Sequence, residues 1–419
     1  MPFALFVAAF FLLFLKSPDA LTYPQFWAED GAVFFKQQLG EVFPQVFVPY
    51  AGYLHVGPRL IAWLASHFSY SISPLIFNVS ALCIDAACIT YAALWASRIF
   101  GLYVVLISFF VIPTAGDIFG SITNIQWFLQ FFLVLALLAP NWSCSNAKIA
   151  NKLIYIPVLI AALSGPFSTL LAAFTIAIYM LKGMKRSGVN FLETRNFSVI
   201  TDASAYLWSI FRKDVLVVIF IGGAIQVAAM LSNEVRTPEA SMALSLDQIK
   251  QLGLFIWPEH PYVSIVNRWF TPLHVLLLGI FVTTTVSCLI SAYKRPRPYI
   301  FLCVFLLMYG AIQPVMAYSK QQANHTLAAT SHYFYFWGVV SLFIIGRFLT
   351  SHVSPVRIPL FFVCFGVYIY MASIKPNYFR RAPLPNLYWE NYAQRIAAGE
   401  KNVLIPLNPF SWHFVANAK

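Results

Sequence analysis

Long apolar runs, separated by short breaks at charged residues, proline and glycine, recur along nearly the whole chain of 419 residues. Hydrophobic residues make up 60% of the sequence and charged residues only 10%, whereas about 25% of the residues of a soluble domain are charged. So little charge over such a length leaves most of the chain without a surface that can face water. The sequence therefore predicts a polytopic membrane protein.

The apolar runs give the candidate membrane spans, which are residues 3–15, 73–97, 101–115, 124–139, 153–165, 167–181, 214–231, 272–293, 298–317, 333–349 and 358–374. Several are shorter than the roughly 20 residues that a straight span needs. We expect the first to be a membrane anchor rather than a signal peptide, because it has neither a basic leader nor a small-residue cleavage motif. The predicted fold class is all-α: a transmembrane bundle of about eleven spans within residues 1–374, followed by a small outer tail at 375–419.

Charge along the chain predicts its orientation. With a cytoplasmic N-terminus and alternating spans, the inner loops carry 14 basic and 3 acidic residues, and the outer loops carry 13 basic and 11 acidic residues. Because Lys and Arg are in excess on the cytoplasmic side of membrane proteins, we expect this arrangement and an outer C-terminus. The long loops 16–57 and 232–271 then face outward, and function is expected there. The inner loop 182–213 is expected to be a solvated basic surface near anionic headgroups.

Two adjacent acids, Glu29 and Asp30, lie among aromatic residues in the first outer loop. Neighbouring side chains point in different directions on a helix or strand, so at most one is expected to face a given substrate atom. Gly31 permits a tight turn after them, and the amphipathic stretch 32–35 is expected to lie along the membrane surface. The alternative for Asp30 is a cap on the helix that follows.

A third acid, Asp117, lies in a short loop predicted on the same face. Two carboxylates that converge from separate loops suit a general base that deprotonates an acceptor hydroxyl, with the second acid orienting that hydroxyl. Partial burial would raise the pKa of the base toward its working range. The loop of Asp117 has no second acid close by, and the six cysteines lie in or beside apolar runs. We therefore predict no cofactor and no catalytic metal, with a divalent cation as the alternative.

Cationic and His residues at span ends or in the outer loops are candidates for binding a lipid-borne phosphate: Arg59, Arg268, Lys320, His325 and His332. A phosphate leaving group does not need protonation but needs its charge stabilised, and Arg and Lys supply that stabilisation. Any one of them is alternatively an interfacial anchor whose head group reaches the lipid headgroups. Aromatic side chains near Trp27, Tyr53 and Trp127 fit sugar stacking and interfacial belts equally well.

Several short motifs occur in an order that resembles the GT-C superfamily of membrane glycosyltransferases. They are Phe26–Phe34, Pro49–Leu60, Thr123–Trp127, Ser164–Phe167 and Ile405–Trp412. More narrowly, the chain is similar to bacterial glucosyltransferases that modify O-antigen, a part of lipopolysaccharide, or other surface polysaccharides of the cell envelope. Each motif is short, but together they cover nearly the whole chain.

The resemblance implies an inverting transferase that moves a hexose such as glucose from a polyprenyl-phosphate sugar to a surface or lipid-linked glycan. It places the enzyme in the bacterial inner membrane with its site toward the periplasm, and it implies no nucleic-acid partner. The catalytic carboxylates map to the pair Glu29 and Asp30 and to Asp117. We expect Asp30 to remove the proton from the attacking hydroxyl, with Glu29 as the alternative base. Substrate binding is expected at Tyr53, His55, Arg59, Asn124, Trp127, Arg268, Lys320, His325, His332 and Tyr333.

One position departs from the pattern of this family. Related sequences often carry Arg-Tyr where this chain has His332-Tyr333. A neutral His binds phosphate less well than Arg does. The phosphate of the donor therefore falls either to a protonated His332 or to Arg59, Arg268 or Lys320.

Two other functions stay open. A flippase for lipid-linked sugars would carry polar groups near the midplane of the membrane, and Asp85 within run 73–97 is such a group. A structural hydrogen bond inside the bundle is the alternative for Asp85. A polysaccharide polymerase or ligase would share the lipid-linked donor but transfer a whole glycan from a pyrophosphate.

Overall fold

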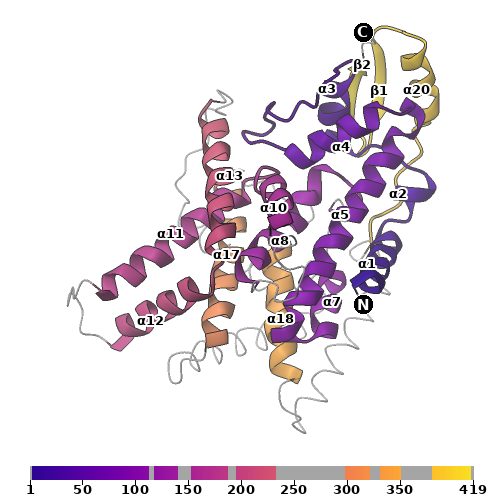
Figure 1. The fold of residues 1–419 in the computed structure, drawn as a ribbon. Coiled ribbons are helices and arrows are strands. Elements are labelled where there is room, and N and C mark those ends of the chain that lie inside the picture. The colour runs from indigo at the N-terminus through magenta and orange to yellow at the C-terminus, as the bar shows by residue number, and fades with distance from the viewer. Residues whose placement is uncertain are drawn as a thin grey trace.

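The computed structural model describes residues 2–112, 118–139, 152–186, 195–232, 298–320, 331–350 and 380–416. These residues form a mostly helical body, with a small unit of one helix and two strands packed at one end (Figure 1). One hydrophobic core lies inside the helical body, and a second lies between this small unit and the first loop.

The principal helices of the body are α1 (Pro2–Lys16), α5 (Ser73–Trp95), α7 (Leu102–Val111), α8 (Gln126–Leu138), α10 (Tyr155–Ala162), α11 (Phe167–Arg186), α13 (Lys213–Ser232), α17 (Pro298–Lys320) and α18 (Tyr335–Thr350). Helix α5 packs against α1 and α8, and α13 packs against α10 and α11. Short elements connect them: η2 (Tyr70–Ile72), α6 (Ser97–Phe100), η3 (Thr123–Ile125) and η5 (Ser331–Phe334). All of the predicted runs that fall on described residues therefore contain a helix. The runs 272–293 and 358–374, like most of the loop 232–271, lie outside the described residues.

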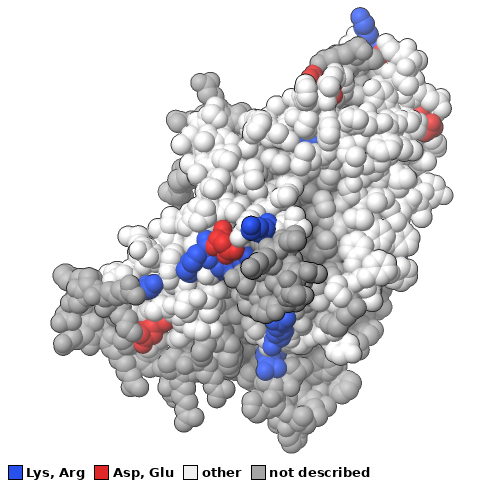
Figure 2. All heavy atoms as spheres, in the orientation of Figure 1, with Lys and Arg blue, Asp and Glu red and all other residues white. Residues whose placement is uncertain are grey.

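Three helical stretches in the described part of the chain are long and apolar enough to cross a membrane: Tyr70–Trp95, Phe167–Met184 and Lys213–Ser232. The other apolar helical stretches found there, among them Ile300–Gln313 within α17, are shorter, between 10 and 17 residues. The predicted number of about eleven spans therefore stays a prediction. On the face drawn in Figure 2 the charged side chains are few. Some lie at the end that holds the C-terminal segment and the others lie in the opposite half, with an uncharged expanse between them. An uncharged expanse of this kind is the surface expected of a body that faces lipid.

The inner loop predicted as a solvated surface contains a packed helix, α12 (Arg195–Ile210), which lies against α11. Ser204 and Leu207 are buried, and the ring of Trp208 lies 4.8 Å from that of Tyr179. The prediction of a merely solvated surface is therefore wrong for this stretch. Its apolar residues occupy one helical face, so its hydropathy averaged over a window is low although the helix packs.

The first loop is folded rather than extended. It contains α2 (Asp19–Thr22), the π-helix η1 (Asp30–Phe35), α3 (Lys36–Gln38) and the start of α4 (Val56–Ser66). Val33, Phe34 and Phe35 are all buried, so the expectation that this stretch lies along the membrane surface is wrong. Their apolar side chains instead enter the second core, together with residues from the C-terminal end of the chain.

The C-terminal segment begins with α20 (Trp389–Ala397) and continues into an antiparallel hairpin of β1 (Val403–Leu407) and β2 (Trp412–Ala416). Alternate residues of β1 are buried, as the two-residue repeat of a strand dictates. The all-α prediction is therefore wrong for this segment, although it holds for the body. The ring of Trp389 packs 4.8 Å from Phe26 and 5.3 Å from Phe35, so the segment rests directly on the first loop.

Candidate functional site

Asp30 is completely buried, and its carboxylate accepts four hydrogen bonds from one short stretch of chain. The donors are the Thr123 hydroxyl at 2.6 Å, the Thr123 amide at 3.0 Å, and the Ser121 hydroxyl and the Ile122 amide, each at 3.2 Å. These groups open η3, which leads into α8. Asp30 therefore caps a helix, which was the alternative expected for it. The capped helix is η3, which is distant in sequence, and not the helix that directly follows Asp30.

Two opposing effects act on the proton of Asp30. Burial favours the neutral carboxyl, and the charge of Glu29 adds to this, whereas the hydrogen bonds from Thr123 and Ile122 favour the carboxylate. Burial dominates and raises the pKa of Asp30 to about 7. The group thus titrates near neutral pH, but in this structure it is enclosed and faces its own cap donors.

Glu29 points elsewhere, as expected for the neighbour of Asp30. Its side chain is partly exposed, and the Tyr50 hydroxyl donates a hydrogen bond of 3.4 Å to Oε1. Burial raises the pKa of Tyr50, and both the charge of Glu29 and this hydrogen bond raise it further. Tyr50 therefore stays a neutral donor toward Glu29, and Glu29 is the acid of the pair that faces the aromatic residues.

A tight turn presents two of these aromatic residues. The amide of Tyr50 donates to the Tyr53 carbonyl at 2.9 Å, and the amide of Tyr53 donates to the Tyr50 carbonyl at 3.1 Å. Between them, Ala51 has φ 51° and Gly52 has φ 89°. Positive φ at both central residues is the pattern of a type I′ turn. The ring of Tyr53 then lies 4.6 Å from the ring of His55.

A second group of predicted residues comes from η3, α8 and η5. The Asn124 side-chain oxygen accepts a hydrogen bond of 3.2 Å from the Trp127 indole nitrogen. The Trp127 ring lies 4.9 Å from His332 and 5.2 Å from Tyr333. Burial raises the pKa of Tyr53, and the nearby Tyr333 contributes to the rise. The turn of the first loop and the entrance to α18 therefore meet beside the start of α8.

Arg59, in the first turn and a half of α4, is 1% exposed. Its Nη2 donates a hydrogen bond of 3.0 Å to the Val48 carbonyl, and its guanidinium lies 5.1 Å from the centre of the Phe34 ring. Burial lowers the pKa of Arg59 to about 10, so the group remains charged at neutral pH.

The remaining predicted residues are not placed by these contacts. Asp117, Arg268 and His325 lie outside the described residues, and Lys320 is the last residue of α17. Within the described ranges, no three His, Cys, Asp or Glu side chains come together as a possible metal-ligand group.

One residue of the site was missed by the sequence analysis. Gln226 in α13 is completely buried; its Oε1 accepts a 2.8 Å bond from the Leu54 amide, and its Nε2 donates 3.1 Å bonds to the carbonyls of Leu54 and Gly165. It therefore fixes the segment of chain before His55 to the connection between α10 and α11. The signal available in the sequence was a lone Gln inside the apolar run 214–231.

The C-terminal segment holds the acidic pair from the other side. The amide of Ala28 donates to the Asn408 carbonyl at 2.5 Å. A Cβ at Gly31 would lie 2.7 Å from Leu407 Cδ2. Gly31 lies within the helix η1, so the expected tight turn is wrong, and glycine is needed there for close approach of the hairpin.

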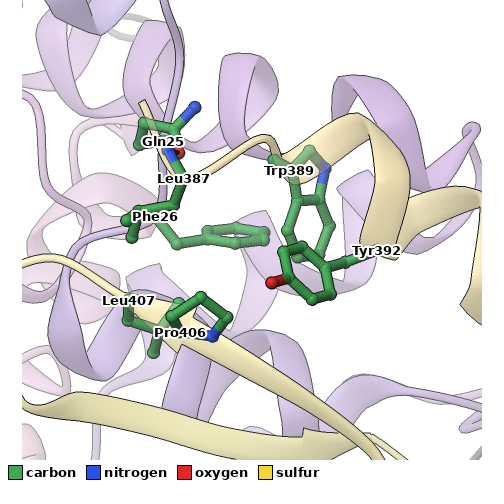
Figure 3. Close-up of a pocket in the computed structure, with 7 residues that line it drawn as sticks. All are labelled: Gln25, Phe26, Leu387, Trp389, Tyr392, Pro406 and Leu407. Atoms are coloured by element: carbon green, nitrogen blue, oxygen red, sulfur yellow. Dashed lines mark hydrogen bonds between the residues drawn. The ribbon is translucent and has the colours of Figure 1, made fainter. Parts of the chain in front are cut away.

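A hollow lies beside this contact, between the first loop and the C-terminal segment (Figure 3). It is lined by Gln25, Phe26, Leu387, Trp389, Tyr392, Pro406 and Leu407. None of the predicted catalytic or substrate-binding residues that the structure describes lines it. We therefore place the candidate site at Glu29 and its aromatic neighbours and not at this hollow.

No protein-family model matches the sequence, and no curated protein matches it. Among solved structures, the chain is similar to the archaeal oligosaccharyltransferase AglB from Archaeoglobus fulgidus in complex with an inhibitory peptide and a dolichol-phosphate. The two sequences are 13% identical, the TM-score is 0.47, and the similarity covers 95% of this chain and 58% of that chain. The chain thus spans little more than half of that protein. At this level of similarity, function has to be inferred from the site itself.

Proposed function

We propose that the chain is a membrane glycosyltransferase that moves a sugar from a polyprenyl-phosphate donor to a hydroxyl of a glycan acceptor on the outer face of the membrane. The observation that carries the proposal is the position of Glu29. It is a partly exposed carboxylate that accepts a hydrogen bond from Tyr50 and lies where the first loop meets the start of α8. The order of the sequence motifs supports the same class of reaction.

In the proposed reaction Glu29 is the general base. It removes the proton from the acceptor hydroxyl, whose oxygen then forms a bond to the anomeric carbon of the sugar. The bond from that carbon to the phosphate oxygen breaks on the opposite side, and its electron pair leaves with the lipid phosphate. The anomeric configuration is therefore inverted. Cationic side chains stabilise the charge that develops on the phosphate.

Asp30 takes a different role from the one expected of it. Its four hydrogen bonds fix the first loop to the start of η3, so we assign it to holding Glu29 near the start of α8, where the rings of Trp127 and Tyr333 meet. These rings, with Tyr53, supply flat apolar faces on which a sugar stacks. Asp117 remains a predicted second acid that orients the acceptor.

Finer features of the proposal come from the sequence resemblance alone. They are a hexose such as glucose as the sugar, O-antigen or another surface polysaccharide as the acceptor, and a periplasmic site in a bacterial inner membrane. The topology is tested by reporter fusions. A fusion after Gln45 should report outside and a fusion after Val189 should report inside, and an inside signal at Gln45 would contradict the proposed site.

The function is tested with the purified protein and a panel of polyprenyl-phosphate sugars, each assayed with and without a glycan acceptor. We expect one donor to be consumed only when acceptor is present, with inversion at the anomeric carbon. Glu29→Gln should remove this activity, and Glu400→Gln, an exposed acid of the C-terminal segment, should keep it. No transfer from any donor would contradict the proposal.

A flippase is the second candidate, and Asp85 favours it. Asp85 is completely buried in α5, and among the described residues neither of its carboxyl oxygens has a hydrogen-bond partner. The expected structural hydrogen bond is therefore not found there. The test measures translocation of a lipid-linked sugar across the membrane of proteoliposomes. Translocation by the wild type that is lost in Asp85→Asn, with no glycosyl transfer by either protein, would favour the flippase.

A further inference from the structure

Three arginines are buried in the described part of the chain, and they differ in their partners. Arg212 and Arg381 are 6% and 3% exposed, and each pairs with a carboxylate: Asp214 at 2.5 Å and Asp19 at 2.8 Å. Arg59 is 1% exposed and pairs with none within the described ranges. A buried cation without a counter-charge is costly, since the loss of hydration is not offset by an ion pair.

The donors of Arg59 are also mostly unused. Nη2 bonds to the Val48 carbonyl at 3.0 Å, but Nε and Nη1 have no hydrogen-bond partner in the structure as described. A guanidinium presents its donors in a planar fork that matches the oxygens of a phosphate or carboxylate. The free edge of Arg59 is therefore suited to an anion that is not part of the described chain.

His55 lies one helical turn before Arg59 and shares this property. It is 1% exposed, and neither of its ring nitrogens has a hydrogen-bond partner among the described residues. Burial lowers the pKa of His55 to about 3, and the charge of Arg59 contributes. The ring is therefore neutral and offers one N–H donor beside the guanidinium.

Residues 42–48, which supply the carbonyl that Arg59 contacts, carry exposed apolar side chains. Val42, Phe43 and Phe47 are 77%, 76% and 80% exposed. Main-chain groups anchor the segment to α4, because the Val42 carbonyl accepts a 2.9 Å bond from Trp63 and the Val48 carbonyl accepts the bond from Arg59. An unpaired buried cation that contacts a segment with exposed apolar side chains is complementary to an anion that carries an apolar chain.

We propose that Arg59, assisted by His55, binds the phosphate of an isoprenoid lipid phosphate, whose hydrocarbon chain lies along residues 42–48. A phosphate oxygen replaces the Val48 carbonyl on Nη2, and a second oxygen takes the free Nε or Nη1. The inference rests on the proposed function in treating this lipid as the sugar donor. It assigns the phosphate to Arg59 rather than to His332, which packs against the rings of Trp127 and Tyr333.

The binding test uses the full-length protein in detergent, with farnesyl phosphate, farnesol and inorganic phosphate as probes and calorimetric titration as the measurement. We expect farnesyl phosphate to bind at least about 10-fold more tightly than either of the others, because both the anion and the chain contribute. Loss of hydrogen bonds to a charged group weakens binding by about 10- to 100-fold. Arg59→Met should therefore bind farnesyl phosphate about 10- to 100-fold more weakly, and Arg59→Lys should lose less affinity. His55→Phe should bind it about 3- to 10-fold more weakly.

A matched control separates a ligand site from a structural arginine. Without ligand, Arg59→Met should unfold at the same or a higher temperature than the wild type, because an unpaired buried charge is removed. Arg381→Met is the same exchange at an arginine that has its carboxylate. It should unfold at a lower temperature because Asp19 loses its partner, and it should keep the wild-type affinity for farnesyl phosphate.

Several results would overturn the inference. One is wild-type affinity of Arg59→Met for farnesyl phosphate, and another is a marked loss of its ligand-free stability. The third is equally tight binding of inorganic phosphate, or equal competition by phosphatidylglycerol in nanodiscs, since the site would then recognise any phosphate or any anionic lipid.

The inference and the proposed function fail separately. Binding of farnesyl phosphate that depends on Arg59, with no sugar transfer from any donor, would contradict the glycosyltransferase and leave the phosphate site standing. Undiminished sugar transfer by Arg59→Met would contradict the phosphate site and leave the glycosyltransferase standing.

Discussion

Asp30 and Thr123 lie 93 positions apart in the sequence, and two hydrogen bonds join them, at 2.6 Å from the Thr123 hydroxyl and 3.0 Å from its amide. The junction ties the first loop to the start of η3 and therefore to the residues that enter α8. Because the carboxylate of Asp30 is used in this way, its neighbour Glu29 is the acid that faces the aromatic side chains. This division of contacts is the basis of our proposal that Asp30 positions the loop and Glu29 carries the chemistry.

The first prediction separates the two acids. Glu29→Gln should lower the turnover number by about 100-fold or more, on the usual scale for a general base, with an unchanged unfolding temperature. Asp30→Asn should lower the free energy of unfolding by about 1–3 kcal/mol, because an amide nitrogen then faces donors that need an acceptor. Thermal unfolding and single-turnover assays of both variants check this. The opposite ranking would return the base to Asp30.

The second prediction concerns pH. The pKa of Asp30 is about 7 in the folded chain and about 3.9 when unfolded. Between pH 4 and pH 7 the folded state holds a proton that the unfolded state has lost, so the free energy of unfolding falls as pH rises through this window. A difference of three pKa units between the folded and unfolded states corresponds to a change of at most about 4 kcal/mol in the free energy of unfolding.

The measurement is the unfolding temperature between pH 4 and pH 8 for the wild type and for Asp30→Asn. The variant should show a flatter profile over the window, because its amide does not titrate. If the two profiles run parallel, then the proton of Asp30 does not couple to folding and the cap carries a carboxylate throughout.

The third prediction tests the turn that presents Tyr50 and Tyr53. Gly52 has φ 89°, and apart from its chain neighbours no atom of the described residues lies within 4 Å of the place that a Cβ would take there, so Gly52→Ala should destabilise through backbone strain. The expected loss is about 1–2 kcal/mol. Ala51, at φ 51°, is the matched control, because Ala51→Gly relieves strain at the adjacent position and should be neutral or stabilising. Denaturant unfolding compares the two, and equal losses would argue against the type I′ turn.

The helices of the body were largely predictable, and the contacts of the site largely were not. The runs 73–97 and 214–231 coincide with α5 and α13 to within two residues at each end, because membrane spans are apolar all round. Helix α12 was missed because only one of its faces is apolar. The adjacency of Glu29 and Asp30 indicated that they point apart. Nothing local could indicate that Asp30 would cap η3, since a cap between distant segments depends on the tertiary fold.

The last prediction tests whether the C-terminal hairpin positions the acidic pair. A Cβ at position 31 would lie 2.7 Å from Leu407 Cδ2, so Gly31→Ala should push the hairpin and η1 apart and lower both stability and turnover. Leu407→Ala removes a buried side chain that is 3% exposed and should cost about 2–5 kcal/mol. In the double variant the new methyl group occupies space that Leu407 has left. The double variant should therefore lose at least about 0.5 kcal/mol less than the two single losses added together. Turnover should recover with stability, because Glu29 is two residues from position 31 and moves with it. Additive losses, or restored stability without restored turnover, would show that the hairpin packs on the first loop without setting the position of Glu29.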